Sequence, residues 1–152
     1  MGDTFAIEIS DMQDAREVLH VADPVRALTT NASDLRLHAE HEIRQMMRHM
    51  RLHLLLAAND ARELGHLLVS GVPSFAAYMR AALRLSDQEA PLETPSVIER
   101  TATLIDANPS PMIQCHRARS DDAPSIPISD PLVEEYSEFV RRLMSFIDRL
   151  SP

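Results

Sequence analysis

The stretch that decides the fold is SDLRLHAEHEIRQMMRHMRLHLLLAAND, residues 33–60, which contains neither glycine nor proline. Its apolar residues recur every three or four positions, a spacing that places side chains on one face of an α-helix. The pattern predicts one amphipathic helix of about 26 residues whose apolar stripe faces a core. That stripe comprises Leu35, Ala39, Ile43, Met46, Met50, Leu54 and Ala57.

Residues 60–88 form a second helical stretch, with apolar residues again three and four positions apart. Gly71 and Pro73 lie inside it, and a proline removes a backbone donor and clashes with the preceding turn. We therefore expect this helix to kink or to split in two at these residues. Its predicted core residues are Leu64, Leu67, Leu68, Phe75, Tyr78, Met79, Ala82 and Leu83.

Two prolines mark the starts of later helices. Pro95 and Pro131 each precede an apolar-periodic segment, and proline suits the first helical turn because its missing N–H would have no partner there. Ser129 or Asp130 is the expected cap of the last helix, and the proline-rich, acidic loop near 119–129 is predicted to be flexible. With one further short helix before that loop, the chain is predicted to be mainly α, an antiparallel helical bundle of four to five helices with one short N-terminal β-strand.

The strand is expected at residues 4–10, within the alternating, β-branched run TFAIEISDM of residues 4–12. No second strand pattern follows that would pair with it. Residues 1–31 are therefore interpreted as an N-terminal strand and linker, and residues 32–152 as the helical bundle. An exposed strand edge is a template for pairing with another chain, so a partner polypeptide or a second copy is expected to bind through 4–10.

The composition limits the classes of function. The chain has 152 residues, enough for one domain with a real core, and no apolar run long enough to span a membrane. Its net charge of −8 argues against general affinity for nucleic acid phosphates, although residues 32–84 hold seven arginines against five acids. A single cysteine and the lack of a basic-then-apolar leader predict a cytoplasmic protein in a reducing compartment.

Histidines crowd the first long helix, where His38, His49 and His53 fall along one side with Glu42. His49 and His53 have the i, i+4 spacing that can grip a metal ion on a helix. The segment is not a zincin motif, because Gln45 stands where a second histidine is required. These histidines are therefore weak metal candidates, and a polar helix flank is the favoured interpretation.

One pair on the same helix is similar to the motif of HEPN ribonucleases, helical proteins that place an arginine and a histidine in a cleft between two protomers. Arg44 and His49 have that spacing, which also occurs twice more on this helix. In such a pair the histidine would move the proton of a 2′-hydroxyl and the arginine would stabilise the developing phosphorane charge. A HEPN-like ribonuclease or toxin using Arg44 and His49 is therefore one alternative function.

A wider resemblance covers most of the chain. FAIEISDMQDAREVLHVADPVRAL and LRLHAEHEIRQMMRHMRLHLLLAAND resemble the later part of bacterial nucleotidyltransferase-like proteins, which join a small polymerase-β-type head to a helical bundle. In that family a strand of the form F-P-I-E-hydrophobic-x-D-M ends the catalytic sheet, and its counterpart here is Phe5 to Met12. The segments REVLHVADPV, AEHEIR, SFAAYMRAALRL and FIDRL are similar to HRVLYGEDPL, CEHELR, SFLALFRALLRL and the family's terminal helix, in the same order.

This resemblance implies a bundle without its catalytic head. Family heads bind nucleotide through a Gly-Ser turn and an Asp-x-Asp pair, which hold the triphosphate and two metal ions, and neither occurs at the front of this chain. Only the last strand remains, with Glu8 at the place of the family's third carboxylate. The implied function is a non-catalytic accessory or substrate-binding domain without a cofactor, acting with a partner head or as a homo-oligomer.

The resemblance also points to candidate binding residues. Glu42 and Arg44 lie in the family-like EHEIR, and Arg80 lies in the family-like YMRAALRL. Arginine could meet a phosphate or carboxylate, and glutamate an amine. An equally good alternative is an internal Glu–Arg pair that serves only to fix the packing of the helices. A purely structural, oligomerising bundle is the third alternative.

Overall fold

The computed structural model describes residues 32–57, 59–118 and 123–150 of the chain. These ranges are mainly α and contain five helices and no strand. The predicted strand at 4–10, its carboxylate Glu8 and the linker to residue 31 lie outside the described residues. The helices are α2 (Ala32–Leu56), α3 (Ala61–Leu85), α4 (Thr94–Ile105), α5 (Ser110–Ala118) and α6 (Pro131–Arg149).

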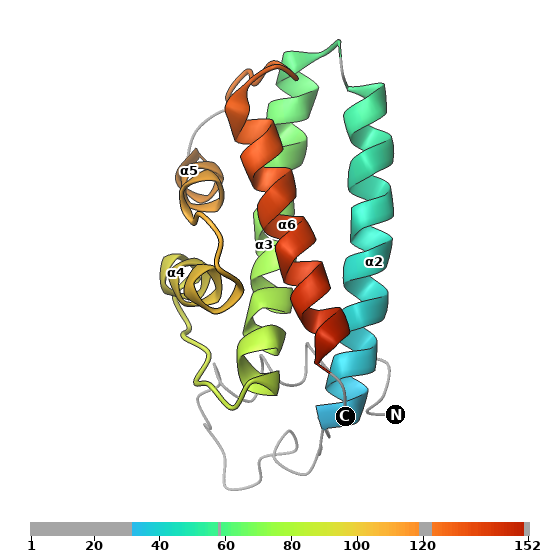
Figure 1. Cartoon of the computed structure of the whole chain (residues 1–152). Coiled ribbons are helices and arrows are strands. Elements are labelled where there is room, and N and C mark those ends of the chain that lie inside the picture. The colour runs from blue at the N-terminus through green and yellow to red at the C-terminus, as the bar shows by residue number, and fades with distance from the viewer. Residues whose placement is uncertain (1–31, 58, 119–122, 151–152) are drawn as a thin grey trace, which may run out of the picture.

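Three long helices form the body of the bundle. Figure 1 shows α2, α3 and α6 side by side. Helix α2 runs opposite to both α3 and α6, as predicted for an antiparallel bundle, whereas α3 and α6 run in the same direction. The two short helices differ from that prediction, because α4 and α5 lie across the long ones on the side away from α2. They pack on α3 and α6, which leaves α2 covered by α3 and α6 alone among the described helices.

Side-chain caps set the starts of two long helices. The carboxylate of Asp60 accepts hydrogen bonds from the backbone N–H groups of Arg62 and Glu63, both at 3.1 Å, and so satisfies donors that have no partner within α3. Of the two residues predicted to cap α6, Asp130 does so, accepting from the Leu132 N–H at 2.9 Å. Proline then occupies the first position of α6, as predicted.

Helix α3 runs unbroken through Gly71 and Pro73, so of the two predicted alternatives, a kink or a split, the split is wrong. Pro73 is exposed, and residues before and after it, such as Leu68 and Phe75, are fully buried in one core. Packing on both sides of the proline therefore holds one helix together although the local propensity opposes it. Gly71 leaves room for a neighbour, because a Cβ there would lie 3.0 Å from the hydroxyl oxygen of Tyr136.

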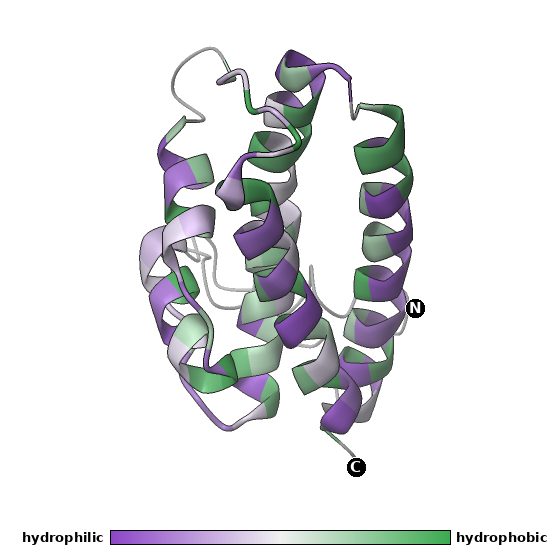
Figure 2. Ribbon diagram, turned by 45° about the horizontal axis from the view of Figure 1, so that its top comes forward, coloured by the Kyte–Doolittle hydropathy of each residue, from purple (hydrophilic) through white to green (hydrophobic). Residues whose placement is uncertain are grey.

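The core lies where the helices face one another, and Figure 2 shows hydrophobic colour on these inner faces. The stripe predicted for α2 is buried at Leu35, Ala39, Ile43, Met50 and Ala57. Met47 is also buried, at 5% exposure, whereas Met46 and Leu54 are only partly buried. The buried face is thus rotated toward α6, because α2 packs against two helices rather than one.

None of the described helices is both long and apolar enough to cross a membrane.

Candidate functional site

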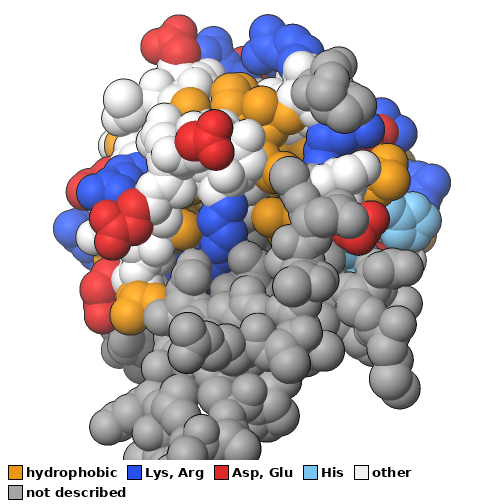
Figure 3. Space-filling view, turned by 90° about the horizontal axis from the view of Figure 1, so that it is seen from below, with side chains coloured by type: hydrophobic (Ala, Val, Ile, Leu, Met, Phe, Trp, Pro, Cys, Tyr) orange, Lys and Arg blue, Asp and Glu red, His pale blue; other side chains and the backbone are white. Residues whose placement is uncertain are grey.

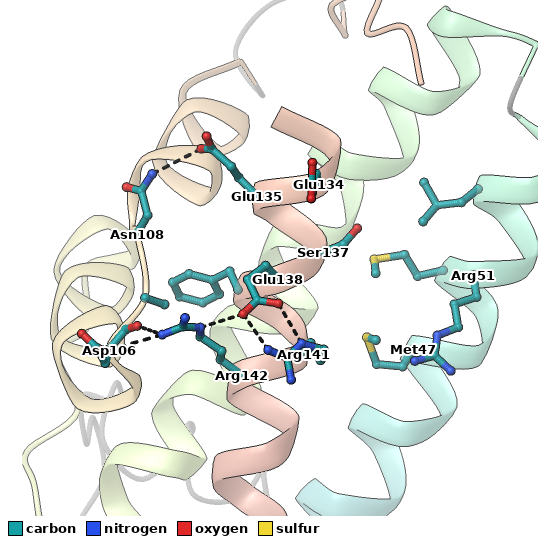
Figure 4. Close-up of a pocket in the computed structure, with 14 residues that line it drawn as sticks. Met47, Arg51, Asp106, Asn108, Glu134, Glu135, Ser137, Glu138, Arg141 and Arg142 are labelled. Carbon is teal, nitrogen blue, oxygen red and sulfur yellow. Dashed lines mark hydrogen bonds and ion pairs between the residues drawn. The ribbon is translucent and has the colours of Figure 1, made fainter. Parts of the chain in front are cut away.

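A groove of about 650 Å³ separates α2 from α6 (Figure 4). Its floor is apolar, and charged and polar side chains line its two walls and the α4–α5 connection. A volume of this size lies in the range of protein binding sites. The lining residues are Met47, Met50, Arg51, Leu54, Asp106, Ala107, Asn108, Glu134, Glu135, Ser137, Glu138, Phe139, Arg141 and Arg142.

The α2 wall follows from helical spacing. Met47, Met50, Arg51 and Leu54 recur at intervals of three and four residues and therefore share one face of α2. Met50, like Met47, is 5% exposed, and Leu54 is half-buried, so methionine and leucine form the floor. Arg51 is exposed at its edge. Methionine side chains are flexible and polarisable, which suits a surface that adapts to a partner.

The α6 wall is polar and also follows the helix repeat. Figure 4 shows Glu134, Ser137, Glu138 and Arg141 along α6, with Ser137 pointing toward α2 and the Glu138 carboxylate between Arg141 and Arg142. The Ser137 hydroxyl donates to a backbone carbonyl one turn earlier, so it is already satisfied within the helix. Phe139 adds the only aromatic ring among the lining residues. The groove thus combines an apolar floor with a polar wall.

An ion-pair network joins three charged residues of α6. Glu138 pairs with Arg141 at 2.6 Å and with Arg142 at 2.8 Å. Hydrogen bonds from Arg141 and then Arg142 lower the pKa of the Glu138 carboxyl from 4.5 to about 2. Glu138 is therefore ionised at any physiological pH, and the two arginines share its single negative charge.

The α4–α5 connection is tied to the same helix. Arg142 donates to the backbone carbonyl of Asp106 and also lies 3.6 Å from its carboxylate. Asp106 adopts a left-handed conformation, with φ of 53°, where α4 ends, a conformation that aspartate tolerates. Two residues later, Asn108 donates to the Glu135 carboxylate at 3.2 Å. These contacts close the groove on the side opposite α2.

The start of α6 is positioned by the segment before it. The Ile126 N–H donates to the carbonyl of Ala61 at 2.8 Å, and the Ile126 side chain is buried. Gly65 makes this contact possible, because a Cβ there would lie 1.7 Å from the carbonyl oxygen of Pro124. The predicted flexible loop near 119–129 thus includes a residue docked on α3, while 119–122 lie outside the described residues.

Apolar side chains also surround the C-terminal end of α2. Leu52, Leu55 and Leu56 are 53%, 77% and 73% exposed, on the sides of the helix that do not face the core. Figure 2 shows hydrophobic colour around this end of the helix. A helix that is apolar on all sides is normally buried. These three residues are called the leucine edge below. Leu55 lies one turn after the groove residue Arg51, whereas Leu52 and Leu56 lie on the side of α2 opposite the groove residue Leu54.

The residues proposed from the sequence lie outside this groove. Arg44 pairs with Glu40 at 2.8 Å and with Asp148 of α6 at 3.1 Å, so it links α2 to α6. Glu42 points elsewhere, because a separation of two residues turns it about 200° from Arg44. The ion pair expected with Glu42 is therefore made by Glu40. Arg80 donates to the carbonyls of Pro91 and Leu92 and so holds the α3–α4 connection.

Figure 3 shows the end of the bundle where α2 begins, with hydrophobic side chains among arginines and carboxylates. There Arg36 and Glu40, both less than 20% exposed, form an ion pair at 3.3 Å that extends the Arg44 pairs. Four charged residues, Arg36, Glu40, Arg44 and Asp148, therefore form one chain of ion pairs.

The histidine candidates are spread over α2. His49 and His53 are exposed, and His38 is half-buried. The described part of the chain holds no group of three or more His, Cys, Asp or Glu side chains arranged for a metal ion. The five-residue separation of Arg44 and His49 turns them about 140° apart around the helix. The structure therefore does not bring this pair together within one copy.

The groove residues of α6 were not named from the sequence. Their spacing at 134, 137, 138 and 141 marks one helix face, but charged residues on a helix face are usually solvated. Only the packing of α6 beside α2 reveals that this face lines a groove.

Comparison with models of protein families, with curated proteins and with solved structures found no match to this chain.

Proposed function

We propose that this chain is a non-catalytic helical accessory domain of a cytoplasmic nucleotidyltransferase-like system, and that it acts by binding protein. Its partner is a separate head or a second copy of the chain. One observation carries the proposal: α2 lines a groove with an apolar floor and also exposes the three leucines of the leucine edge, so this helix presents apolar surface with polar margins. Surfaces of this kind mark protein interaction sites.

The ionisable groups of the groove support binding rather than catalysis. A carboxyl with a pKa of about 2, as in Glu138, has no proton to donate and little basicity near pH 7. Outside the groove, the Cys115 thiol of α5 is buried, which raises its pKa to about 11, so it is not an activated nucleophile. The arginines beside Glu138 are held by it and by Asp106.

The link to a nucleotidyltransferase head rests on the sequence resemblance. The AEHEIR segment contributes Arg44, and the SFAAYMRAALRL segment contributes Arg80. Both arginines hold elements of the bundle together, through ion pairs to α6 and through carbonyls of the α3–α4 connection. Their role in the proposed accessory domain is thus to shape the bundle that a partner meets.

The test compares two leucine variants. Leu55→Glu places a charge in the leucine edge, and Leu92→Glu is the matched control, since both leucines are more than half exposed and lie far apart in the chain. Mass in solution is measured for the chain alone and with any nucleotidyltransferase-type head that a neighbouring gene encodes. Leu55→Glu should weaken the assembly that forms by at least about tenfold, the value of one buried leucine at an interface.

Two results would overturn the proposal. One is a chain that stays monomeric and binds no such head. The other is an assembly that forms equally well with Leu55→Glu and with the control. Cleavage of RNA by the purified chain that disappears in His49→Ala would instead favour the HEPN-like nuclease.

A further inference from the structure

We propose that a second copy of this chain occupies the α2–α6 groove, forming a symmetric dimer whose two-fold axis runs parallel to α2 and α6. In this dimer α2 of one copy lies against α6 of the other, twice. The inference deepens the proposed function by naming the partner of the groove, and its test is separable from binding of a head.

The first argument for this dimer is charge, because the two walls of the groove carry charges of opposite sign. Arg51 lines the groove on α2, and Arg48 is exposed one turn before it. Glu134 and Glu135 line it at the start of α6, and both are exposed, with Glu135 accepting a hydrogen bond from Asn108 on the side away from α2. No ion pair joins any of these four residues to another side chain within the described ranges. The α2 wall is thus basic, and the upper α6 wall is acidic.

Symmetry is the second step. When two copies meet groove to groove, a two-fold axis parallel to the helices brings the α2 wall of one copy opposite the α6 wall of the other. Arg51 then faces Glu134 of the second copy, and the reverse contact forms at the same time. An axis perpendicular to the helices and level with Arg51 would instead set α2 against α2, with arginine facing arginine. Like charges placed opposite each other disfavour that arrangement.

The balance of charge favours a second copy over another partner. At this end of the groove, Arg51 and the neighbouring Arg48 lie on one side and Glu134 and Glu135 on the other, while Arg141 and Arg142 farther along α6 are paired with Glu138 and Asp106. A partner of one charge sign would therefore be repelled by one of the two sides. A second copy presents the same walls in the exchanged order and matches both. Such self-complementarity is the property required of a surface that pairs with itself.

Apolar surface supplies the driving force. Leu55 is 77% exposed and lies one turn after the groove residue Arg51. Closing two grooves on each other would cover this leucine and the floor of Met47, Met50 and Leu54. The result is an apolar centre bordered by charged residues, as in stable protein interfaces.

The experiment exchanges the charges of one wall at a time. An acid-walled variant carries Arg48→Glu and Arg51→Glu, and a base-walled variant carries Glu134→Arg and Glu135→Arg. The control carries Arg62→Glu and Arg117→Glu, which alter two exposed arginines of α3 and α5 away from the groove. Masses are measured by light scattering and native mass spectrometry, and circular dichroism verifies that each variant is folded.

We expect the wild type and the control to have twice the chain mass of 17.1 kDa. Each wall variant alone should dissociate at least about 100-fold more readily and run as a monomer, because like charges then face each other. An equal mixture of the two should restore a dimer containing one copy of each. This rescue separates loss of the interface from loss of folding.

Three results would overturn the dimer: a monomeric wild type, dimers that persist in both wall variants, or folded variants that do not pair on mixing. A chain that is monomeric alone but binds a head, with Leu55→Glu weakening that complex, would overturn the dimer and leave the proposed function standing. A chain that neither self-associates nor binds a head would overturn both.

Discussion

Gly65 offers the sharpest test of how the groove is built. Substitution by alanine would place a Cβ 1.7 Å from the carbonyl oxygen of Pro124 and 2.9 Å from its carbonyl carbon. Both are backbone atoms, so no side chain can rotate away, and the segment that leads into α6 has to move off α3. That movement withdraws Ile126, which is 4% exposed and donates to the Ala61 carbonyl at 2.8 Å.

The expected cost combines three effects. Exposing the Ile126 side chain costs about 2 kcal/mol, and losing its hydrogen bond costs about 1 kcal/mol. Replacing glycine by alanine within a helix stabilises the helix by about 1 kcal/mol, which offsets part of this loss. We therefore expect Gly65→Ala to lower the free energy of unfolding by about 2 kcal/mol, although the same change in an unobstructed helix would raise it.

The assay is urea denaturation followed by circular dichroism at 222 nm. Ser70→Ala is the control, because Ser70 is exposed on α3 and its hydroxyl bonds only within the helix. A Gly65→Ala protein as stable as the wild type, or more stable, would refute the close packing of Pro124 on α3. A double-mutant cycle adds a second check: Ile126→Ala should cost much less in the Gly65→Ala background than in the wild type.

Three further predictions concern single groups. Tyr136→Phe removes the hydroxyl that donates to the Leu68 carbonyl at 3.0 Å, so urea denaturation should show a loss of about 1 kcal/mol. The Glu138 pKa of about 2 lies below its ordinary 4.5, so its pairing stabilises the fold above pH 4.5 and is lost as the pH falls toward 2. Carboxyl NMR titration should show that pKa rising in Arg141→Ala, and an unchanged value would contradict the pairing. Burial raises the Cys115 pKa to about 11, so at pH 8 a disulfide reagent should label it at least about 100-fold more slowly in folded than in urea-unfolded protein; equal rates would contradict its burial.

Most helices of this fold were predictable because their signals are local. The apolar repeat of residues 33–60 depends only on the 3.6-residue turn, and it predicts α2 nearly to its ends. Asp130 and Pro131 mark the start of α6 through groups within one turn of each other. The split expected at Pro73 failed because burial on both sides of the proline outweighs the local penalty.

The candidate site was not predictable in the same way. The sequence singled out Arg44, which links α2 to α6 outside the groove. The predicted partner of Arg44 was Glu42, but its ion pairs are with Glu40 and Asp148. Asp148 lies 104 residues away from Arg44 along the chain, and helical periodicity carries no information about contacts at that separation. For the same reason, the sequence did not predict that acidic residues of α6 line a groove beside α2.

The sequence by itself thus determined which segments are helical and which face of each is apolar, since both depend on neighbours within one or two turns. Only the tertiary structure decided that α2 lies beside both α3 and α6, which rotates its buried face from Met46 toward Met47. It also decided that Arg51 and Glu134 face one groove, because the relative position of two helices depends on packing and on close contacts such as that of Gly65 with Pro124.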